Sequence, residues 1–274
     1  MHATAQLMRR FASTGSGAAL ARVGGASKPH FLKAKAGQPG EDAWFAHSRE
    51  RVALIGVADG TSAKHGGAYA RELMAAAARA AAAADGAATA DVASLLRASW
   101  EDAADASIEG RSTAVLAKVD LERAQLEAVL LGDSGLLVAR PAAEGGYRAA
   151  LRSVAQQHYF NCPFTCGTLE GVEDNTPEDA QLLSCELEAG DVVIVGTDGL
   201  FDTMFESDIL EALGEHAGAD ASELAEGVAA QCRSLMQLDG SRQTPLTEAA
   251  GDEGLIVRPG EGVDDVTVVL VRVD

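Results

Sequence analysis

The chain has 274 residues, 47% of them hydrophobic, and a formal net charge of −19 at pH 7. This composition fits one large or two small globular domains with an ordinary core. Residues 1–40 contain six Lys or Arg and no Asp or Glu, so the rest carries 16 basic against 41 acidic side chains. The strong negative charge of residues 41–274 repels phosphates, which argues against nucleic-acid partners. No stretch of 18 uninterrupted apolar residues occurs, so the sequence predicts no membrane insertion.

The first residues have the composition of an organelle targeting peptide. The segment Met8-Arg9-Arg10-Phe11-Ala12-Ser13-Thr14 is basic and free of acids, and it resembles a mitochondrial processing site with cleavage after Phe11. We therefore expect residues 1–17 to be a transit peptide to the mitochondrion, or alternatively to the chloroplast. A disordered basic leader is the other interpretation. Residues 18–274 show no repeat or second composition block and are expected to form one domain.

The predicted elements alternate between groups of strands and pairs of helices. Strands are expected at 20–29, 42–47, 52–58, 112–119, 126–131, 136–140, 147–154, 191–196 and 266–273, and helices at 68–84, 91–106, 207–213 and 222–236. Ser207 and Ser222 are the expected N-caps of the last two helices, and residues 156–180 and 237–262 are expected to be irregular. Most strand-to-strand links are hairpins, which favours antiparallel sheets. The predicted fold is α+β, a four-layer αββα sandwich of two antiparallel sheets flanked by helices.

Acidic side chains stand at the ends of five apolar strands. The segments are Gly40-Glu41-Asp42-Ala43, Val57-Ala58-Asp59-Gly60, Leu131-Gly132-Asp133-Ser134, Gly196-Thr197-Asp198-Gly199 and Val263-Asp264-Asp265-Val266. Carboxylates gathered at strand ends repel one another unless a cation lies between them, and their oxygens suit hard divalent ions such as Mg²⁺ or Mn²⁺. The pattern therefore predicts a metal site.

Strand pairing explains how acids far apart in the sequence converge. A turn over residues 48–51 predicts a register that sets Glu41 beside Ala58, and so next to Asp59. If the strand before Asp198 and the strand after Asp264 are antiparallel neighbours, these two carboxylates also emerge at one end. Gly60 follows Asp59 and Gly199 follows Asp198, and each Asp-Gly pair permits a tight turn. The carbonyl oxygen of Gly60 is a further candidate metal ligand.

Four carboxylates at one end of a sandwich suit a pair of divalent ions. Two ions about 3.5–4 Å apart can hold a bridging water, lower its pKa and stabilise the incoming and leaving oxygens of an in-line displacement. Hydrolysis of phosphate esters is the reaction class that best uses this arrangement.

The ordered motifs resemble those of the metal-dependent type 2C (PPM) serine/threonine protein phosphatases, from about residue 21 to residue 273. The branch most similar is the mitochondrial and plastid one that includes the T-cell-activation phosphatase homologues. The segments that carry this likeness are Gly56-Val57-Ala58-Asp59-Gly60, Ala70-Arg71-Glu72-Leu73-Met74, Gln156-Gln157-His158-Tyr159-Phe160-Asn161, Asp198-Gly199-Leu200-Phe201-Asp202 and Gln243-Thr244-Pro245-Leu246. The resemblance implies a β-sandwich flanked by helices, a site for two Mn²⁺ or Mg²⁺ ions with a weaker third, and hydrolysis of phosphoproteins without a covalent enzyme intermediate.

The resemblance also implies a role for each acid. Asp59 would bridge both metals, with Glu41 and the Gly60 carbonyl completing one site and Asp198 and Asp264 the other. Asp59 and Asp198 are therefore the principal catalytic candidates. Of the acids nearby, Asp42 would hold metal-bound water, and Asp133 would either help the third ion or cap a hairpin turn. Asp202 and Asp265 are expected to support backbone turns.

The sequence departs from the family pattern at two positions. The broader family has His after Asp-Gly as a general acid, whereas this chain has Thr61, and the nearby His65 is read as a solvated loop residue. The phosphate-binding Arg expected four residues before Glu41 is replaced by Gly37. Lys33 and Lys35 are candidates for that phosphate contact, and a solvated basic strand end is the other interpretation.

Two other functions stay open at this point, a catalytically inactive phosphatase-like binding module and a small-molecule phosphohydrolase. None of the four core carboxylates is lost, which weighs against the inactive module. The cysteines match no zinc pattern, so ordinary reduced thiols are favoured over a metal or redox pair at Cys162 and Cys166. We expect a monomer.

Overall fold

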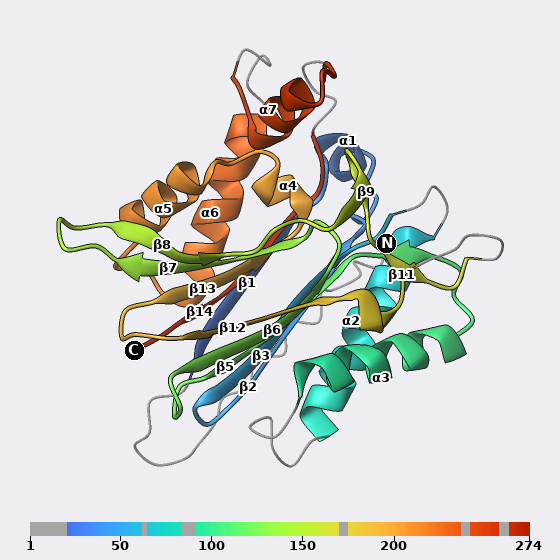
Figure 1. Cartoon of the computed structure of the whole chain (residues 1–274), viewed down its shortest axis with the longest axis horizontal. Coiled ribbons are helices and arrows are strands. Elements are labelled where there is room, and N and C mark those ends of the chain that lie inside the picture. Colours follow the sequence, from blue (N-terminus) through green and yellow to red (C-terminus); the bar gives the residue numbers. More distant parts are fainter. Residues whose placement is uncertain (1–20, 62–64, 84–90, 170–174, 237–241, 258–262) are drawn as a thin grey trace.

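The computed structural model describes residues 21–61, 65–83, 91–169, 175–236, 242–257 and 263–274. Two five-stranded antiparallel sheets are stacked face to face, and helices cover both outer sides (Figure 1). The predicted αββα sandwich is therefore confirmed. The predicted leader, residues 1–17, lies outside the described residues.

The first sheet has the strand order β1-β14-β13-β7-β8. Its strands are β1 (Arg22–Lys28), β7 (Gly135–Pro141), β8 (Tyr147–Arg152), β13 (Val192–Gly196) and β14 (Val266–Arg272). Helices α5 (Glu206–Glu215) and α6 (Ala221–Met236) pack on its outer face. Buried side chains such as Ile194 and Leu270 on the sheet meet Leu213 and Val228 on these helices.

The second sheet has the strand order β12-β6-β5-β3-β2. Its strands are β2 (Asp42–Arg49), β3 (Val52–Asp59), β5 (Ala114–Asp120), β6 (Gln125–Leu131) and β12 (Gln181–Glu186). Helices α2 (Gly66–Ala83) and α3 (Val92–Asp105) cover its outer face. The alanines of α2, among them Ala70 and Ala77, are fully buried, so the Ala-rich run packs closely on the sheet as expected.

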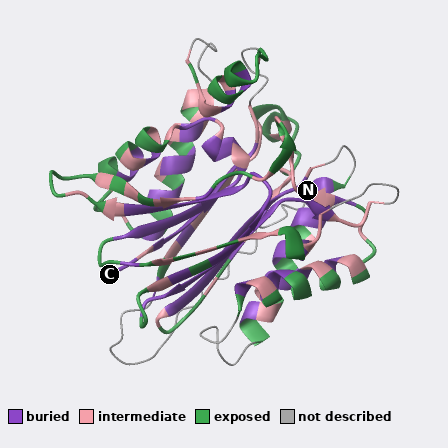
Figure 2. Cartoon of the chain, viewed as in Figure 1, coloured by how far each residue is buried: buried purple, intermediate pink, exposed green. Residues whose placement is uncertain are grey.

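A third apolar cluster fills the space between the two sheets. Ile55 and Val115 from one sheet pack with Val193 and Val269 from the other, and all four are fully buried. Figure 2 shows the central strands of both sheets coloured as buried. Along β3, every residue from Val52 to Asp59 is buried, because this strand is covered on both faces. The rigid sandwich therefore holds the end of β3, where Asp59 lies, in one place.

The sequence pattern does not predict several of the observed elements. They are α1 (Phe31–Lys35), β4 (Arg111–Ser112), β9 (Gln157–Tyr159), β10 (Cys162–Pro163), β11 (Cys166–Gly167), the 3₁₀ turn η2 (Pro177–Asp179), β12, α4 (Asp198–Phe201) and α7 (Pro245–Asp252). Most are too short to show a hydrophobic period, and β12 is a half-exposed edge strand. Helix α7 lies in a region expected to be irregular, although Thr244 forms a capping box ahead of Pro245.

The predicted serine caps are wrong. Asp208 accepts the N–H of Phe205 at the start of α5. At the start of α6, Asp220 accepts the N–H of Ser222 at 2.8 Å, so the aspartate provides the cap. Asp220 directly precedes α6, and Asp208 lies in the first turn of α5. A carboxylate at a helix start also interacts favourably with the helix dipole.

All four cysteines are free thiols, and Cys166 and Cys232 are buried. Within the described residues, no helix has both the length and the hydropathy to cross a lipid bilayer.

Candidate metal centre

The β2–β3 hairpin brings acidic residues to one end of its sheet. Asp42 is the cross-strand partner of Asp59, and the N–H of Gly60 donates to the carbonyl of Glu41 over 3.3 Å. The predicted pairing of Glu41 with Ala58 is wrong by two positions, because β2 runs two residues further than expected before the turn. A shift of two positions keeps each side chain on the same face of the sheet, so the acids still converge.

The pairing of β13 with β14 places a second set of acids. These strands are adjacent and antiparallel, which is the condition under which the two acids were expected to converge, so Asp198 follows one strand and Asp264 precedes the other at the same end. Thr197 joins the two sheets there: its Oγ1 donates to Oδ2 of Asp42 at 2.8 Å and accepts the N–H of Thr267 at 3.1 Å. One hydroxyl therefore ties both sets of acids together.

Two glycines beside these acids touch other segments of the backbone. A Cβ on Gly60 would lie 2.2 Å from the carbonyl carbon of Gly66, at the start of α2. A Cβ on Gly199 would lie 2.0 Å from the carbonyl oxygen of Asp265. Both glycines therefore allow a close approach between backbone segments, which places a helix start and a strand end beside the acids.

The gathered acids repel one another. Burial raises the pKa of Asp59 well above its ordinary value of 3.8, and neighbouring Asp42 and Asp264 raise it further. Burial also raises the pKa of Asp198 well above 3.8, with added repulsion from Asp59 and Asp133. The pKa of Asp264 is raised for the same leading reason, burial, although Lys33 and the N–H of Asp265 act against it. A cation between these groups would remove the repulsion.

Asp42 and Asp202 share this environment. Burial raises the pKa of Asp42 to about 7, opposed by hydrogen bonds from two threonines and supported by repulsion from Asp265 and Asp264. Burial likewise raises the pKa of Asp202 to about 7, and the guanidinium of Arg152 acts against it.

Two buried carboxylate oxygens in the described part of the chain lack any hydrogen-bond partner. They are Oδ1 of Asp133 and Oδ1 of Asp198. The other oxygen of Asp133 accepts from Nε2 of Gln157 at 3.3 Å, and burial raises the pKa of this aspartate to about 6. A buried acceptor without a donor is costly, so these two oxygens are suited to a ligand such as a divalent cation.

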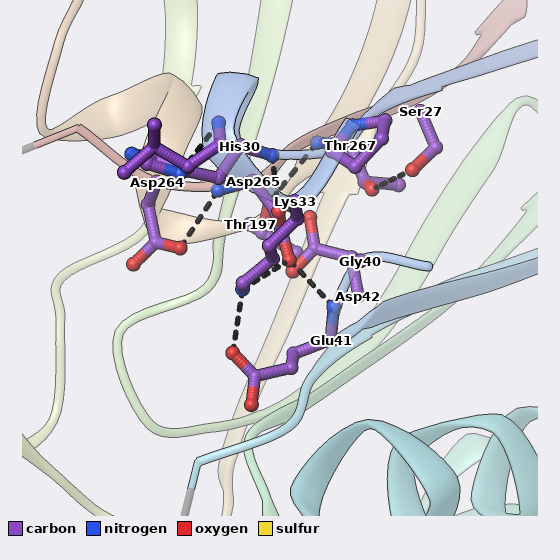
Figure 3. A network of polar contacts seen from close by, with 12 residues as sticks. Ser27, His30, Lys33, Gly40, Glu41, Asp42, Thr197, Asp264, Asp265 and Thr267 are labelled. Carbon is purple, nitrogen blue, oxygen red and sulfur yellow. Dashed lines mark hydrogen bonds and ion pairs between the residues drawn. The ribbon is translucent and has the colours of Figure 1, made fainter. Parts of the chain in front are cut away.

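Lys33 and Lys35 lie in different surroundings. Nζ of Lys33 is 2.6 Å from Oε2 of Glu41 and 3.0 Å from Oδ2 of Asp265 (Figure 3). Burial alone would lower the pKa of Lys33, but its two carboxylate partners raise it above the usual range. Lys35 is exposed at the end of α1. The structure thus brings Lys33, and not Lys35, to the acids.

The residue types fit divalent cations. Glu41, Asp59, Asp198 and Asp264 offer carboxylate oxygens from one end of the sandwich, and a buried oxygen of Asp198 and one of nearby Asp133 lack donors. No group of three or more His, Cys, Asp or Glu side chains among the described residues is placed to hold a metal as it stands. Two acids at this end of the sandwich already have donors from the protein itself. Glu41 pairs with the ammonium of Lys33, and Asp42 accepts the hydroxyl of Thr197.

The two departures from the family pattern have structural counterparts. Thr61 donates its N–H to the carbonyl of Arg111, and His65 is exposed ahead of α2. Gly37 has a φ of 67° just beyond the end of α1, and a Cβ there would meet nothing within 4 Å. A left-handed residue after a helix is a common stop signal that favours glycine. This position therefore serves to end α1.

Three features of the site were not foreseen from the sequence. They are the bond from Thr197 to Asp42, the multiple contacts of Asp265, and Arg152, whose Cζ lies 3.7 Å from the ring centroid of Phe201. All three join segments distant in sequence, and no local pattern reports such contacts. Asp265 accepts the N–H of Glu41 at 2.5 Å, so it supports the backbone just before β2.

Comparison of sequences places the chain in a known family. The family model described as Protein phosphatase 2C matches residues 33–230. "Probable protein phosphatase 2C 55" of Arabidopsis thaliana is 36% identical over 249 residues, which are 88% of this chain and 49% of that protein. "Protein phosphatase PTC7 homolog fig" of Drosophila sechellia is 33% identical over 267 residues, 92% of this chain and 83% of that protein. The chain thus spans about half the length of the Arabidopsis protein.

Solved structures share the fold. The photosystem II phosphatase PBCP superposes with a TM-score of 0.78 at 25% identity, covering 93% of this chain and 99% of PBCP. The catalytic domain of the serine/threonine phosphatase PstP, in complex with two manganese ions, gives 0.59 at 21% identity, covering 93% of this chain and 99% of that domain. Together with the acids at the ends of β3 and β13, these matches identify the chain as a member of the protein phosphatase 2C family.

Proposed function

We propose that this protein is a Mn²⁺- or Mg²⁺-dependent serine/threonine phosphatase that acts on phosphoproteins. The observation that carries this proposal is the ordered set of carboxylates at one end of the two sheets, from Asp42 and Asp59 on one sheet and Asp198 and Asp264 on the other. Residues 18–274 would form the phosphatase domain.

The side chains have distinct roles in this proposal. Asp59, Glu41 and the Gly60 carbonyl would hold one ion, and Asp59, Asp198 and Asp264 the second. When bound, the two ions would supply an activated water for direct attack on phosphorus and would neutralise the phosphate. Asp133 would support a weaker third ion. Asp42, held by Thr197, would orient water beside the ions.

Of the two lysine candidates, Lys33 is the better placed for the substrate phosphate. It is the one of the two lysine candidates that contacts acids of the site, and an ammonium near a phosphate adds a favourable point charge. The names of the relatives support phosphoprotein substrates, since PstP is a serine/threonine protein phosphatase by name. A small-molecule phosphohydrolase and an inactive binding module are the competing functions.

Metal dependence is the direct test. Purified protein given phosphoserine and phosphothreonine peptides should release phosphate when Mn²⁺ or Mg²⁺ is added, and EDTA should stop the release. Re-adding excess Mn²⁺ should restore it. Turnover of p-nitrophenyl phosphate without turnover of phosphopeptides would favour the small-molecule enzyme. No hydrolysis of either substrate with any divalent ion would favour the inactive module.

We also propose an organelle location, either mitochondrial or plastid. The basic, acid-free composition of residues 1–17 motivates it, and PBCP is a photosystem II phosphatase by name. Residues 1–40 fused to a fluorescent protein should direct it into an organelle, with the same fusion carrying Arg9→Glu and Arg10→Glu as control. A wild-type fusion that stays in the cytosol would contradict the proposal.

A further inference from the structure

Asp265 has three donors from one distant segment of the chain. Its Oδ1 accepts the backbone N–H of His30 at 2.5 Å, and its Oδ2 accepts the backbone N–H of Glu41 at 2.5 Å and Nζ of Lys33 at 3.0 Å (Figure 3). The side chain is 1% exposed. The resemblance gives this residue no metal role, and its oxygens already have protein partners.

These contacts hold the segment from His30 to Glu41 at both ends. His30 is the N-cap of α1, and Glu41 directly precedes β2. Helix α1 itself has no buried residue, so apolar packing does not hold it in place. Arg233 adds a second polar link, because its guanidinium donates to the carbonyls of Pro29 and Asp264. The position of the segment is therefore set by polar contacts centred on Asp265.

Gly40 shows how closely the segment from His30 to Glu41 approaches the carboxylate of Asp265. A Cβ on Gly40 would lie 2.9 Å from Oδ2 of Asp265 and 3.1 Å from its Cγ. A side chain at this position would force the segment and the Asp265 carboxylate apart, by moving one or the other.

We propose that Asp265 is a positioning residue of the metal centre. By holding the backbone of Glu41 and the ammonium of Lys33, it sets where the Glu41 carboxylate and the Lys33 charge stand relative to Asp59 and Asp264. This inference rests on the proposed function, because Glu41 matters here as a metal ligand. Removing a group that holds a metal ligand in place through a hydrogen bond typically weakens metal affinity about 10- to 100-fold.

Asp265→Asn is the first test. The amide keeps the size of the side chain but replaces one acceptor oxygen with a donor, so at least one of the three contacts is lost. We expect Mn²⁺ affinity, measured by titration calorimetry, to weaken about 10- to 100-fold. Hydrogen exchange of the His30 and Glu41 amides should accelerate in the metal-free protein.

Asp191→Asn is the matched control. Asp191 is fully buried at the opposite end of β13, where it accepts from Nε and Nη2 of Arg140 at 2.9 and 2.8 Å and from the N–H of Glu188 at 2.8 Å. The two variants remove similar buried contacts and should both lower the melting temperature. Only Asp265→Asn should weaken Mn²⁺ binding and accelerate exchange in residues 30–41.

Gly40→Ala separates position from charge. This variant keeps every charge of the site but forces the segment away from Asp265, so it should also weaken Mn²⁺ binding. If Asp265→Asn weakens binding and Gly40→Ala does not, the effect is one of charge and the positioning role is overturned. Unchanged Mn²⁺ affinity in a folded Asp265→Asn protein would overturn it as well. If the wild-type protein itself neither binds Mn²⁺ nor hydrolyses phosphopeptide, the proposed function fails, whereas the exchange measurement still tests the contacts.

Discussion

Replacing Asp198 with Asn is expected to abolish Mn²⁺-dependent phosphatase activity while leaving the metal-free protein at least as stable as the wild type. Oδ1 of Asp198 is buried without a partner, and the carboxylate is surrounded by other acids. Losing a metal ligand should remove several kcal/mol of transition-state stabilisation, so kcat/KM should fall about a thousandfold or more. The neutral amide also relieves charge repulsion in the absence of metal. Phosphopeptide hydrolysis and thermal melts, each with EDTA and with Mn²⁺, measure both effects.

Burial of the acids, together with their mutual repulsion, predicts how the stability of the metal-free wild type responds to pH. The folded-state pKa values of Asp42 and Asp202 are raised to about 7, and that of Asp133 to about 6, from an ordinary value of 3.8. The folded state therefore binds more protons than the unfolded chain between these values, and stability in EDTA should rise as the pH falls from 8 toward about 5. In the Asp198→Asn protein, this rise in stability at lower pH should be smaller. Saturating Mn²⁺ should also reduce the rise in the wild type.

Asp120→Asn is the control for Asp198→Asn. Asp120 is buried at the β5–β6 turn, where its Oδ1 accepts the N–H groups of Glu122 and Arg123 at 3.0 and 2.9 Å. The amide oxygen of Asn can still accept both N–H groups, so this variant should keep its stability and its activity, whereas Asp198→Asn should lose activity. Full activity in the folded Asp198→Asn protein would refute the two-metal assignment.

Gly60→Ala should destabilise the fold by about 3 kcal/mol or more, since overpacking against backbone leaves no flexible side chain to yield. The new Cβ would lie 2.2 and 2.3 Å from the carbonyl carbon and oxygen of Gly66 and 2.5 Å from the nitrogen of Gly67. Helix α2 would have to move away from the end of β3, and the Gly60 carbonyl would move with it. Chemical denaturation should show the loss, and Mn²⁺ affinity of the remaining folded protein should fall.

Gly214→Ala provides the comparison for this substitution. Gly214 lies in the last turn of α5, and a Cβ there would meet nothing within 4 Å. Alanine is the better helix former by up to about 1 kcal/mol, so this variant should be equally or more stable and fully active. Equal stability of Gly60→Ala and the wild type would show that the β3–α2 junction tolerates a side chain.

Much of the architecture follows from local sequence patterns. Long apolar runs such as Val52–Asp59 and Val192–Gly196 are predictable as strands because turn residues bound them, and the Ala-rich run of α2 is predictable as a helix. The short helices α1 and α4 escape prediction because each is shorter than two helical turns and shows no hydrophobic period. The serine caps fail because α5 begins at Glu206 and α6 at Ala221, so both serines lie inside the helices, and Asp208 and Asp220 accept N–H groups at the two helix starts.

The sequence by itself determined which chemical groups stand at the strand ends of this protein. Carboxylates at strand ends, with glycines beside Asp59 and Asp198, favour a divalent cation whatever the exact register, because charge and residue type do not depend on tertiary detail.

Only the tertiary structure decided which of these groups meet. It set Asp42 opposite Asp59, because the length of β2 before its turn fixes the register. It brought Lys33 rather than Lys35 to the acids, because α1 turns one lysine inward and leaves the other exposed. It also placed Asp265 against the segment that carries Glu41, although 224 positions separate these two residues. No local pattern encodes a contact of that separation, because it depends on how the two sheets pack.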